Sequence, residues 1–244
     1  MPVFPRIGLT ARQLWLMALL ATAAPAVLPA PVVAQSRAEL EKVLRRKVLA
    51  NGLEIIVVEN HGVPIATLEI DVRNGAFTQS PEYAGLAHMY EHMFFKANKD
   101  LPEPDMFTDR AAELGAVFNG STREEVVNYY LTLPADSLDG GLRFLASALR
   151  NPLFREDELK REKEVVLGEY DRNEAEPGFE FIQKSTALLY PGQGSRKNTI
   201  GDRDVIAKVT PDQMRSIQKK YYVPNNSTLI VTGAVDPEKV FALA

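Results

Sequence analysis

The sequence predicts an α+β fold, a mostly antiparallel sheet of five or six strands with helices packed on one face. Short apolar segments with alternating polarity, typical of strands, begin at Val43 and recur as far as Val235. Longer amphipathic segments with helix-capping residues lie between them. The 244 residues, of which 45% are hydrophobic and 25% charged, are enough to bury a sizeable core.

The first residues of the chain, 1–34, have the plan of a secretory signal peptide. Arg6 and Arg12 precede an apolar run, and Val32-Val33-Ala34 places small or modest residues at the usual cleavage offsets before Gln35. Prolines interrupt the run short of the ~20 residues that a membrane span needs. We therefore expect cleavage rather than an uncleaved anchor, a periplasmic or secreted bacterial protein, and no stable membrane span in the mature chain.

Composition excludes several classes of function. The formal net charge is only −4, and no basic run or aromatic platform suggests that nucleic acid is a partner. Cysteine is absent, which rules out disulfides and cysteine-ligated metals. Any metal site must therefore use histidine, aspartate or glutamate.

Residues 35–244 are predicted to form one domain that opens with three strands. The strands at 43–49 and 53–58 flank Asn51-Gly52, a strong hairpin signal. The segment 65–72 alternates in polarity and predicts a third strand. We expect these three strands to form a meander.

Helices and strands then follow one another to the end of the chain. Gly115 and Asn151-Pro152 are placed to end two helices, and Thr210 to begin another. A last helix begins at Asp236 and runs out at Ala244 without a C-cap signal, which predicts either a frayed end or a sequence cut short as one half of something larger. The expected elements are helices at 105–114, 136–150, 156–174, 179–189 and 211–222, and strands at 117–122, 126–133 and 227–235.

One further helix, at 87–95, carries a metal-binding pattern. His88 and His92 lie one turn apart on it, with Glu91 on nearly the same side. Two imidazoles at this spacing can bind one divalent metal, and a carboxylate beside them can take a proton from a metal-bound water. The order is H-x-x-E-H, the reverse of the H-E-x-x-H of other zinc proteases. The remaining histidine, His61, lies in a predicted turn and is expected to be a solvated loop residue.

A catalytic zinc site needs three protein ligands and an open position. The helix at 156–174 offers Glu162, Glu164 and Glu169 as candidates for the missing ligand. Glu162 and Glu169 lie two turns apart on one face, but most charges on a helix belong to a solvated face. Spacing alone therefore leaves the third ligand open.

The chain resembles the pitrilysin/insulinase family of zinc peptidases, the inverzincins, over about residues 43–244. Several motifs occur in the family's order, which makes the resemblance specific. They are Gly85-Leu86-Ala87-His88-Met89-Tyr90-Glu91-His92-Met93-Phe94-Phe95-Lys96, the strand at 115–122, Arg161-Glu162-Lys163 with Val165-Val166-Leu167-Gly168-Glu169, Tyr221-Tyr222-Val223-Pro224-Asn225-Asn226 and Val231-Thr232-Gly233-Ala234-Val235-Asp236.

This resemblance implies a set of roles. His88, His92 and Glu169 would bind Zn²⁺, and Glu91 would be the general base. Glu162 would orient a histidine from outside the ligand set. The strand would bind an extended peptide or unfolded polypeptide substrate at Asn119 and Gly120, although Gly120 stands where the family usually has alanine.

The family's active members also use a second homologous domain or subunit, so we expect such a partner here. The implied function is zinc-dependent endopeptidase or oligopeptidase activity. Two alternatives stay open: a non-catalytic scaffold subunit of a peptidase assembly, and a metal-dependent hydrolase that acts on something other than peptides. A group of aromatic residues could line a substrate pocket but is expected to be core by default: Phe94, Phe95, Phe107 and Phe118.

Overall fold

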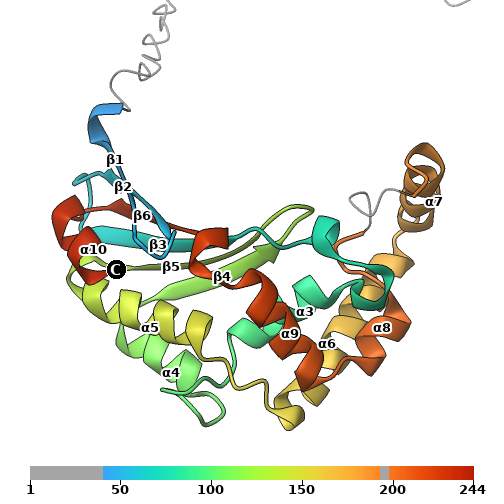
Figure 1. Ribbon diagram of the computed structural model, residues 1–244. Coiled ribbons are helices and arrows are strands. Elements are labelled where there is room, and N and C mark those ends of the chain that lie inside the picture. The colour runs from blue at the N-terminus through green and yellow to red at the C-terminus, as the bar shows by residue number, and fades with distance from the viewer. Residues whose placement is uncertain (1–40, 193–197) are drawn as a thin grey trace, which may run out of the picture. The chain divides into compact units, whose positions relative to one another are not determined.

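The computed structural model describes residues 41–192 and 198–244, which lie within one compact unit, Ala38–Ala244 (Figure 1). The predicted signal peptide falls outside the described residues. The strands are β1 (Leu44–Val48), β2 (Glu54–Glu59), β3 (Ile65–Val72), β4 (Val117–Thr122), β5 (Val127–Pro134) and β6 (Ser227–Gly233). The helices are α3 (Leu86–Phe94), α4 (Met106–Glu113), α5 (Leu138–Arg150), α6 (Glu156–Ala175), α7 (Phe179–Leu189), α8 (Arg203–Lys208), α9 (Pro211–Tyr221) and α10 (Pro237–Leu243).

The strands form a six-stranded sheet in the order β1-β2-β6-β3-β5-β4. Among the described strands, β2 and β6 form the one parallel pair, and the other pairs are antiparallel. The predicted α+β class is confirmed. The predicted meander is wrong, because β6 lies between β2 and β3. The turn between β2 and β3 therefore crosses the end of β6. Asn60 N, just after β2, donates a hydrogen bond to Gly233 O (2.8 Å), and Ala234 N, just after β6, donates one to Ile65 O at the start of β3 (2.9 Å).

One face of the sheet carries the core. Along β3 and β5 every second residue is buried, as expected for strands with one covered face. The residues between them are only half-buried. The buried strand positions are Ile55, Val57, Ala66, Leu68, Ile70, Val72, Val127, Tyr129, Leu131, Leu133, Leu229 and Val231.

Helices cover this buried face. Figure 1 shows α4 and α5 along the sheet, and α3, α6, α8 and α9 gathered towards one end of it. The predicted boundaries at Gly115 and Thr210 are confirmed: Gly115 adopts φ 65° after α4, and Thr210 forms a capping box at the start of α9. The short helix α8 was not predicted, although Asp202 caps it by accepting hydrogen bonds from the backbone of Asp204 and Val205.

In 41–192 and 198–244, no helix combines the length and the apolar character needed to cross a bilayer.

Candidate metal centre

Helix α3 packs its apolar side into the core, and its polar side is half-buried. Its first residue follows Gly85, which adopts φ 95° and lies so close to Gly201 that a Cβ on Gly201 would come within 2.1 Å of the Gly85 Cα. The apolar side packs into the core through Leu86, Ala87, Met89, Tyr90, Met93 and Phe94. The helical period then places His88, Glu91 and His92 together on the side that faces α6 and β4.

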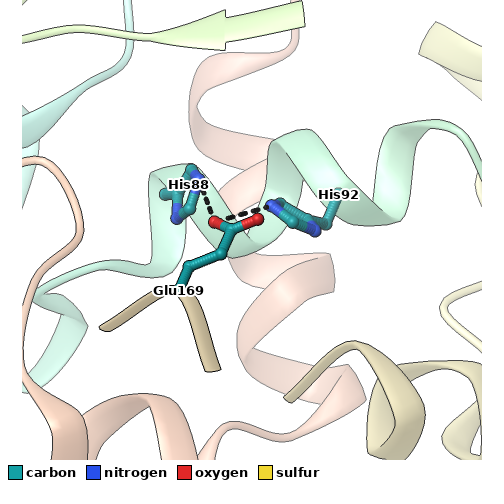
Figure 2. Close-up of side chains that lie close together, drawn as sticks. All are labelled: His88, His92 and Glu169. Carbon is teal, nitrogen blue, oxygen red and sulfur yellow. Dashed lines mark ion pairs between the residues drawn. The ribbon is translucent and has the colours of Figure 1, made fainter. Parts of the chain in front are cut away.

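Helix α6 brings Glu169 to the two histidines. The Nε2 atoms of His88 and His92 lie 3.5 and 3.6 Å from the same oxygen, Glu169 Oε2. Figure 2 shows the carboxylate between the two imidazoles. Among the described residues these three side chains form a group whose ligand atoms all lie within 4.8 Å of one another.

These separations fit the ligands of one small divalent cation. Two ligands about 2.1 Å from a tetrahedral ion lie roughly 3.4 Å apart, close to the two nitrogen-to-oxygen distances. Two imidazoles and one carboxylate are also a donor set found at catalytic zinc sites. The three side chains are only 17%, 17% and 29% exposed. They could therefore hold a metal with a position left open to a further ligand.

The two histidines differ in their protonation. Burial, together with the neighbouring His92, lowers the pKa of His88 to about 4. Its imidazole is therefore neutral at pH 7 and has a lone pair free for a metal. Burial acts the same way on His92, but the hydrogen bond to Glu162 and the charges of Glu169, Glu162 and Glu91 outweigh it and raise the pKa of His92.

Glu162 contacts the back of His92. The Nδ1 of His92 donates a hydrogen bond of 3.0 Å to Glu162 Oε2, which leaves Nε2 directed at Glu169. The other carboxylate oxygen lies 2.6 Å from the Lys96 ammonium. Burial alone would raise the pKa of Glu162, but the hydrogen bonds from His92 and Lys96 hold it below its usual value. Glu162 thus stays ionised and fixes the ring of His92.

Glu91 lies beside the three-residue group without belonging to it. Its Oε2 accepts a hydrogen bond of 2.6 Å from Thr122 Oγ1, at the end of β4. Burial raises the pKa of Glu91, although the Thr122 hydrogen bond and the charge of His92 act in the opposite direction.

Asn119 and Gly120 lie on β4, the edge strand next to α3. Asn119 is exposed, and its Oδ1 accepts a hydrogen bond of 2.8 Å from the Gly120 backbone N–H. Gly120 packs against α3 so closely that a Cβ there would lie 3.0 Å from Glu91 Cγ and 3.2 Å from Phe95 Cε2. Gly120 therefore lies against the candidate site, whereas the exposed Asn119 is the preceding residue of the strand and directs its side chain to the other face.

The other residues considered from sequence fall in less specific places. His61 is an exposed loop residue, and its ring lies 2.7 Å from the Glu59 carboxylate. Phe94 and Phe107 are 1% and 4% exposed and belong to the core, whereas Phe95 and Phe118 are partly buried against it.

Sequence reasoning missed two residues at the site. The sequence motifs include Lys96 and Thr122 but indicate no role for either residue. The signal for Lys96 is its place one turn after His92, which puts its ammonium near Glu162. For Thr122 the sequence offers no comparable signal, because its partner is far away along the chain.

Two family profiles and several known proteins match this chain. The insulinase family profile (Peptidase family M16) matches residues 54–199, and the profile called Peptidase M16 inactive domain matches residues 208–244. Zinc protease PqqE of Helicobacter pylori is 30% identical over 205 residues, which cover 80% of this chain and 44% of the relative. An uncharacterized zinc protease of Rickettsia felis is 26% identical over 196 residues, 80% of this chain and 47% of the relative.

Solved structures share the fold. The crystal structure of a protease from Helicobacter pylori matches 82% of this chain and 48% of its own, with a TM-score of 0.77 and 26% identity. The periplasmic protease PqqL of Escherichia coli matches 83% of this chain and 23% of its own, with a TM-score of 0.76 and 24% identity. The chain thus spans less than half the length of these relatives. Because the first profile alone covers more than half of the sequence and includes both helices of the candidate site, the chain belongs to the insulinase family, Peptidase family M16.

Proposed function

We propose that this chain carries the catalytic site of a zinc-dependent peptidase. The observation that carries the proposal is the convergence of His88, His92 and Glu169 on one place, with the Glu91 carboxylate beside it but outside the ligand group. When bound there, Zn²⁺ would lower the pKa of a coordinated water to near ~7 and polarise a substrate carbonyl. The names of the zinc proteases that this chain resembles support this choice of metal.

Glu91 would do the proton transfer. Its carboxylate would accept a proton from the attacking water and then deliver it to the leaving amine of the cleaved peptide bond. Burial raises its pKa, which makes the carboxylate a stronger base. Its place outside the metal-ligand group leaves it free to act in this way.

Glu162 would support the metal ligands. By accepting a hydrogen bond from the Nδ1–H of His92, it would keep Nε2 unprotonated and directed at the metal. Lys96 balances the negative charge that Glu162 adds to this half-buried site.

The substrate would be an extended peptide or unfolded polypeptide that pairs with β4. This strand ends the sheet order, so its outer edge has no strand partner among the described residues. An extended chain can add to such an edge through main-chain hydrogen bonds. Asn119 and Gly120 would lie beside the bound chain, a few residues from the Thr122 contact with Glu91.

We further propose that a homologous domain or subunit closes over this site. The matched relatives are more than twice as long as the part this chain spans. One of them, the beta subunit of the mitochondrial-processing peptidase of Dictyostelium discoideum, is by its name part of a larger assembly. A signal peptide at 1–34 and a periplasmic location are part of the same proposal, supported by the periplasmic description of PqqL.

Replacement of Glu91 by glutamine tests the proposal. The Glu91→Gln variant is expected to bind zinc as the wild type does and to lose peptide cleavage, because an amide cannot accept the proton. Cleavage of unstructured peptides is measured with and without the homologous subunit, alongside zinc content and a chelator control. A Gln variant that cuts at the wild-type rate would refute the role of Glu91, and cleavage of small esters alone would favour a different hydrolase.

The match of residues 208–244 to the inactive-domain profile favours a second candidate, a scaffold subunit. A scaffold has no need of three converging metal ligands and an adjacent carboxylate. Wild-type chain that binds no zinc, or that cleaves nothing with any partner, would support the scaffold.

A further inference from the structure

Helix α3 and strand β4 meet at one short hydrogen bond. Thr122 Oγ1 donates to Glu91 Oε2 over 2.6 Å, across 31 positions of sequence. Hydroxyl-to-carboxylate hydrogen bonds of this length are charge-assisted and among the stronger ones in proteins. The contact ties the side chain of Glu91 to the sheet rather than to its own helix.

The backbone around Thr122 is itself fixed. Thr122 pairs with Val127 of β5, and the next residue, Arg123, donates a backbone hydrogen bond of 2.9 Å to Val126 O. The hydroxyl therefore projects from the paired end of a strand, next to a tight turn. A donor held in this way restricts the carboxylate that accepts from it.

The same strand also contacts the stem of Glu91. A Cβ on Gly120 would lie only 3.0 Å from Glu91 Cγ, so the absence of a side chain at Gly120 leaves room for the aliphatic part of Glu91. Two successive inward positions of β4 thus lie against one glutamate: Gly120 is beside the aliphatic part of its side chain, and Thr122 is hydrogen-bonded to its carboxylate.

The position of the Glu91 carboxylate needs to be fixed because this side chain lies near the metal ligands. Glu91 lies on α3 three residues after His88 and one residue before His92, the two histidines of the metal-ligand group. A glutamate free to rotate here could join the metal ligands. It would then fill the position that a catalytic site keeps open.

We propose that Thr122 is a positioning residue for Glu91: its hydroxyl holds the carboxylate off the metal-ligand group, in the place from which it accepts a proton from the attacking water. This inference rests on the proposed peptidase function. It gives the hydroxyl of a strand residue a part in placing the proposed base.

The first test measures peptide cleavage by Thr122→Val, which keeps the shape of the side chain and removes the donor. We expect kcat to fall by at least about tenfold while KM and zinc content stay within about twofold of the wild type. Thr122→Ser keeps the donor and should restore kcat to within about threefold. The matched control is Thr67→Val. Thr67 also lies on a strand, away from the candidate site, and its hydroxyl is hydrogen-bonded to the Thr132 hydroxyl over 2.9 Å. This substitution should leave kcat unchanged.

The second test reads the contact without activity. Thermal unfolding is measured for the wild type, Thr122→Val, Glu91→Leu and the double variant. Removal of the Thr122 hydroxyl should lower the melting temperature by about 2–4 °C more when Glu91 is present than when leucine replaces it.

The outcomes separate the two proposals. The inference would be overturned if the melting shifts were additive. It would also be overturned if Thr122→Val kept the wild-type kcat, or if Thr122→Ser lost as much kcat as Thr122→Val. If the melting shifts are coupled but the wild type cleaves no peptide with any partner, the proposed function fails while the hold of Thr122 on Glu91 stands.

Discussion

Replacement of Glu162 should weaken zinc binding even though Glu162 lies outside the ligand group. Its two oxygens serve two different donors, His92 Nδ1 at 3.0 Å and Lys96 Nζ at 2.6 Å, and its side chain is only 11% exposed. Glutamine has the same shape but offers one oxygen and one NH₂ group. In Glu162→Gln, one of the two donors must therefore face another donor.

The magnitude follows from which donor loses its partner. Lys96 is 33% exposed and can turn to water, so the cheaper arrangement keeps the amide oxygen on His92 and gives up the ammonium. His92 Nδ1 then donates to a neutral amide oxygen in place of a carboxylate, and this hydrogen bond is about half as strong. Loss of such a support weakens metal binding by about 10- to 100-fold, or roughly 1.4–2.8 kcal/mol. We expect Glu162→Gln at the lower limit and Glu162→Leu, which supplies no acceptor, at the upper limit.

The assay is competition for Zn²⁺ between each variant and a fluorescent chelator at fixed pH. Glu164→Gln is the matched control, because Glu164 is exposed on the same helix and the substitution removes the same charge. It should bind zinc as the wild type does. If Glu162→Leu also binds zinc within about twofold of the wild type, the hydrogen bond to His92 does not support the metal site and the reasoning is wrong.

Three further predictions concern the ligand set, the fold and pH. Glu169→Gln should lose stoichiometric zinc, measured by metal analysis after gel filtration; unchanged zinc would mean that another carboxylate is the third ligand. Gly201→Ala should destabilise the fold by at least about 2 kcal/mol in urea unfolding, because its Cβ would come within 2.1 Å of Gly85 Cα; a stable variant would contradict this close approach. Burial and the Glu69 carboxylate raise the pKa of Asp71 to about 6, so the folded state loses stability as pH rises from about 4 to 6. Asp71→Asn should therefore be more stable than the wild type at pH 7.5, by about 1 kcal/mol given the partial exposure of Asp71, and equal to it at pH 4; equal stability at both values would refute the shift.

Local patterns predicted most of the elements because each pattern depends on neighbours in sequence. The Asn51-Gly52 turn and the Thr210 cap are short-range features, and the structure has both. The place of β6 in the sheet was not predictable in this way. Whether Ser227–Gly233 adds at an edge or between β2 and β3 depends on how strands distant in sequence pair, and both places bury the same alternate residues.

The site residues also differ in whether local sequence patterns predict them. His88, Glu91 and His92 were found from spacing on one helix. Glu169 could be separated from Glu162 only through the resemblance, since both lie on one face of α6. The structure brings Glu169 to the Nε2 atoms and Glu162 to Nδ1 of His92, which gives the two carboxylates different partners. Their assigned roles in metal binding and catalysis stay predictions that the variants above can test.

The position of β4 links the proposed base to the proposed substrate. In the part of the chain that the structure describes, β4 pairs only with β5, so its other edge could accept an extended peptide, while Thr122 on its inward face donates a hydrogen bond to Glu91. A peptide added at that free edge would give β4 a second set of backbone hydrogen bonds and so restrict its motion. Because Thr122 lies on the same strand, this restriction would extend to the carboxylate that it holds. Substrate binding and the placement of the base would then be consequences of the same strand pairing, and a peptide too short to pair along β4 should be cut more slowly at saturation as well as bound more weakly.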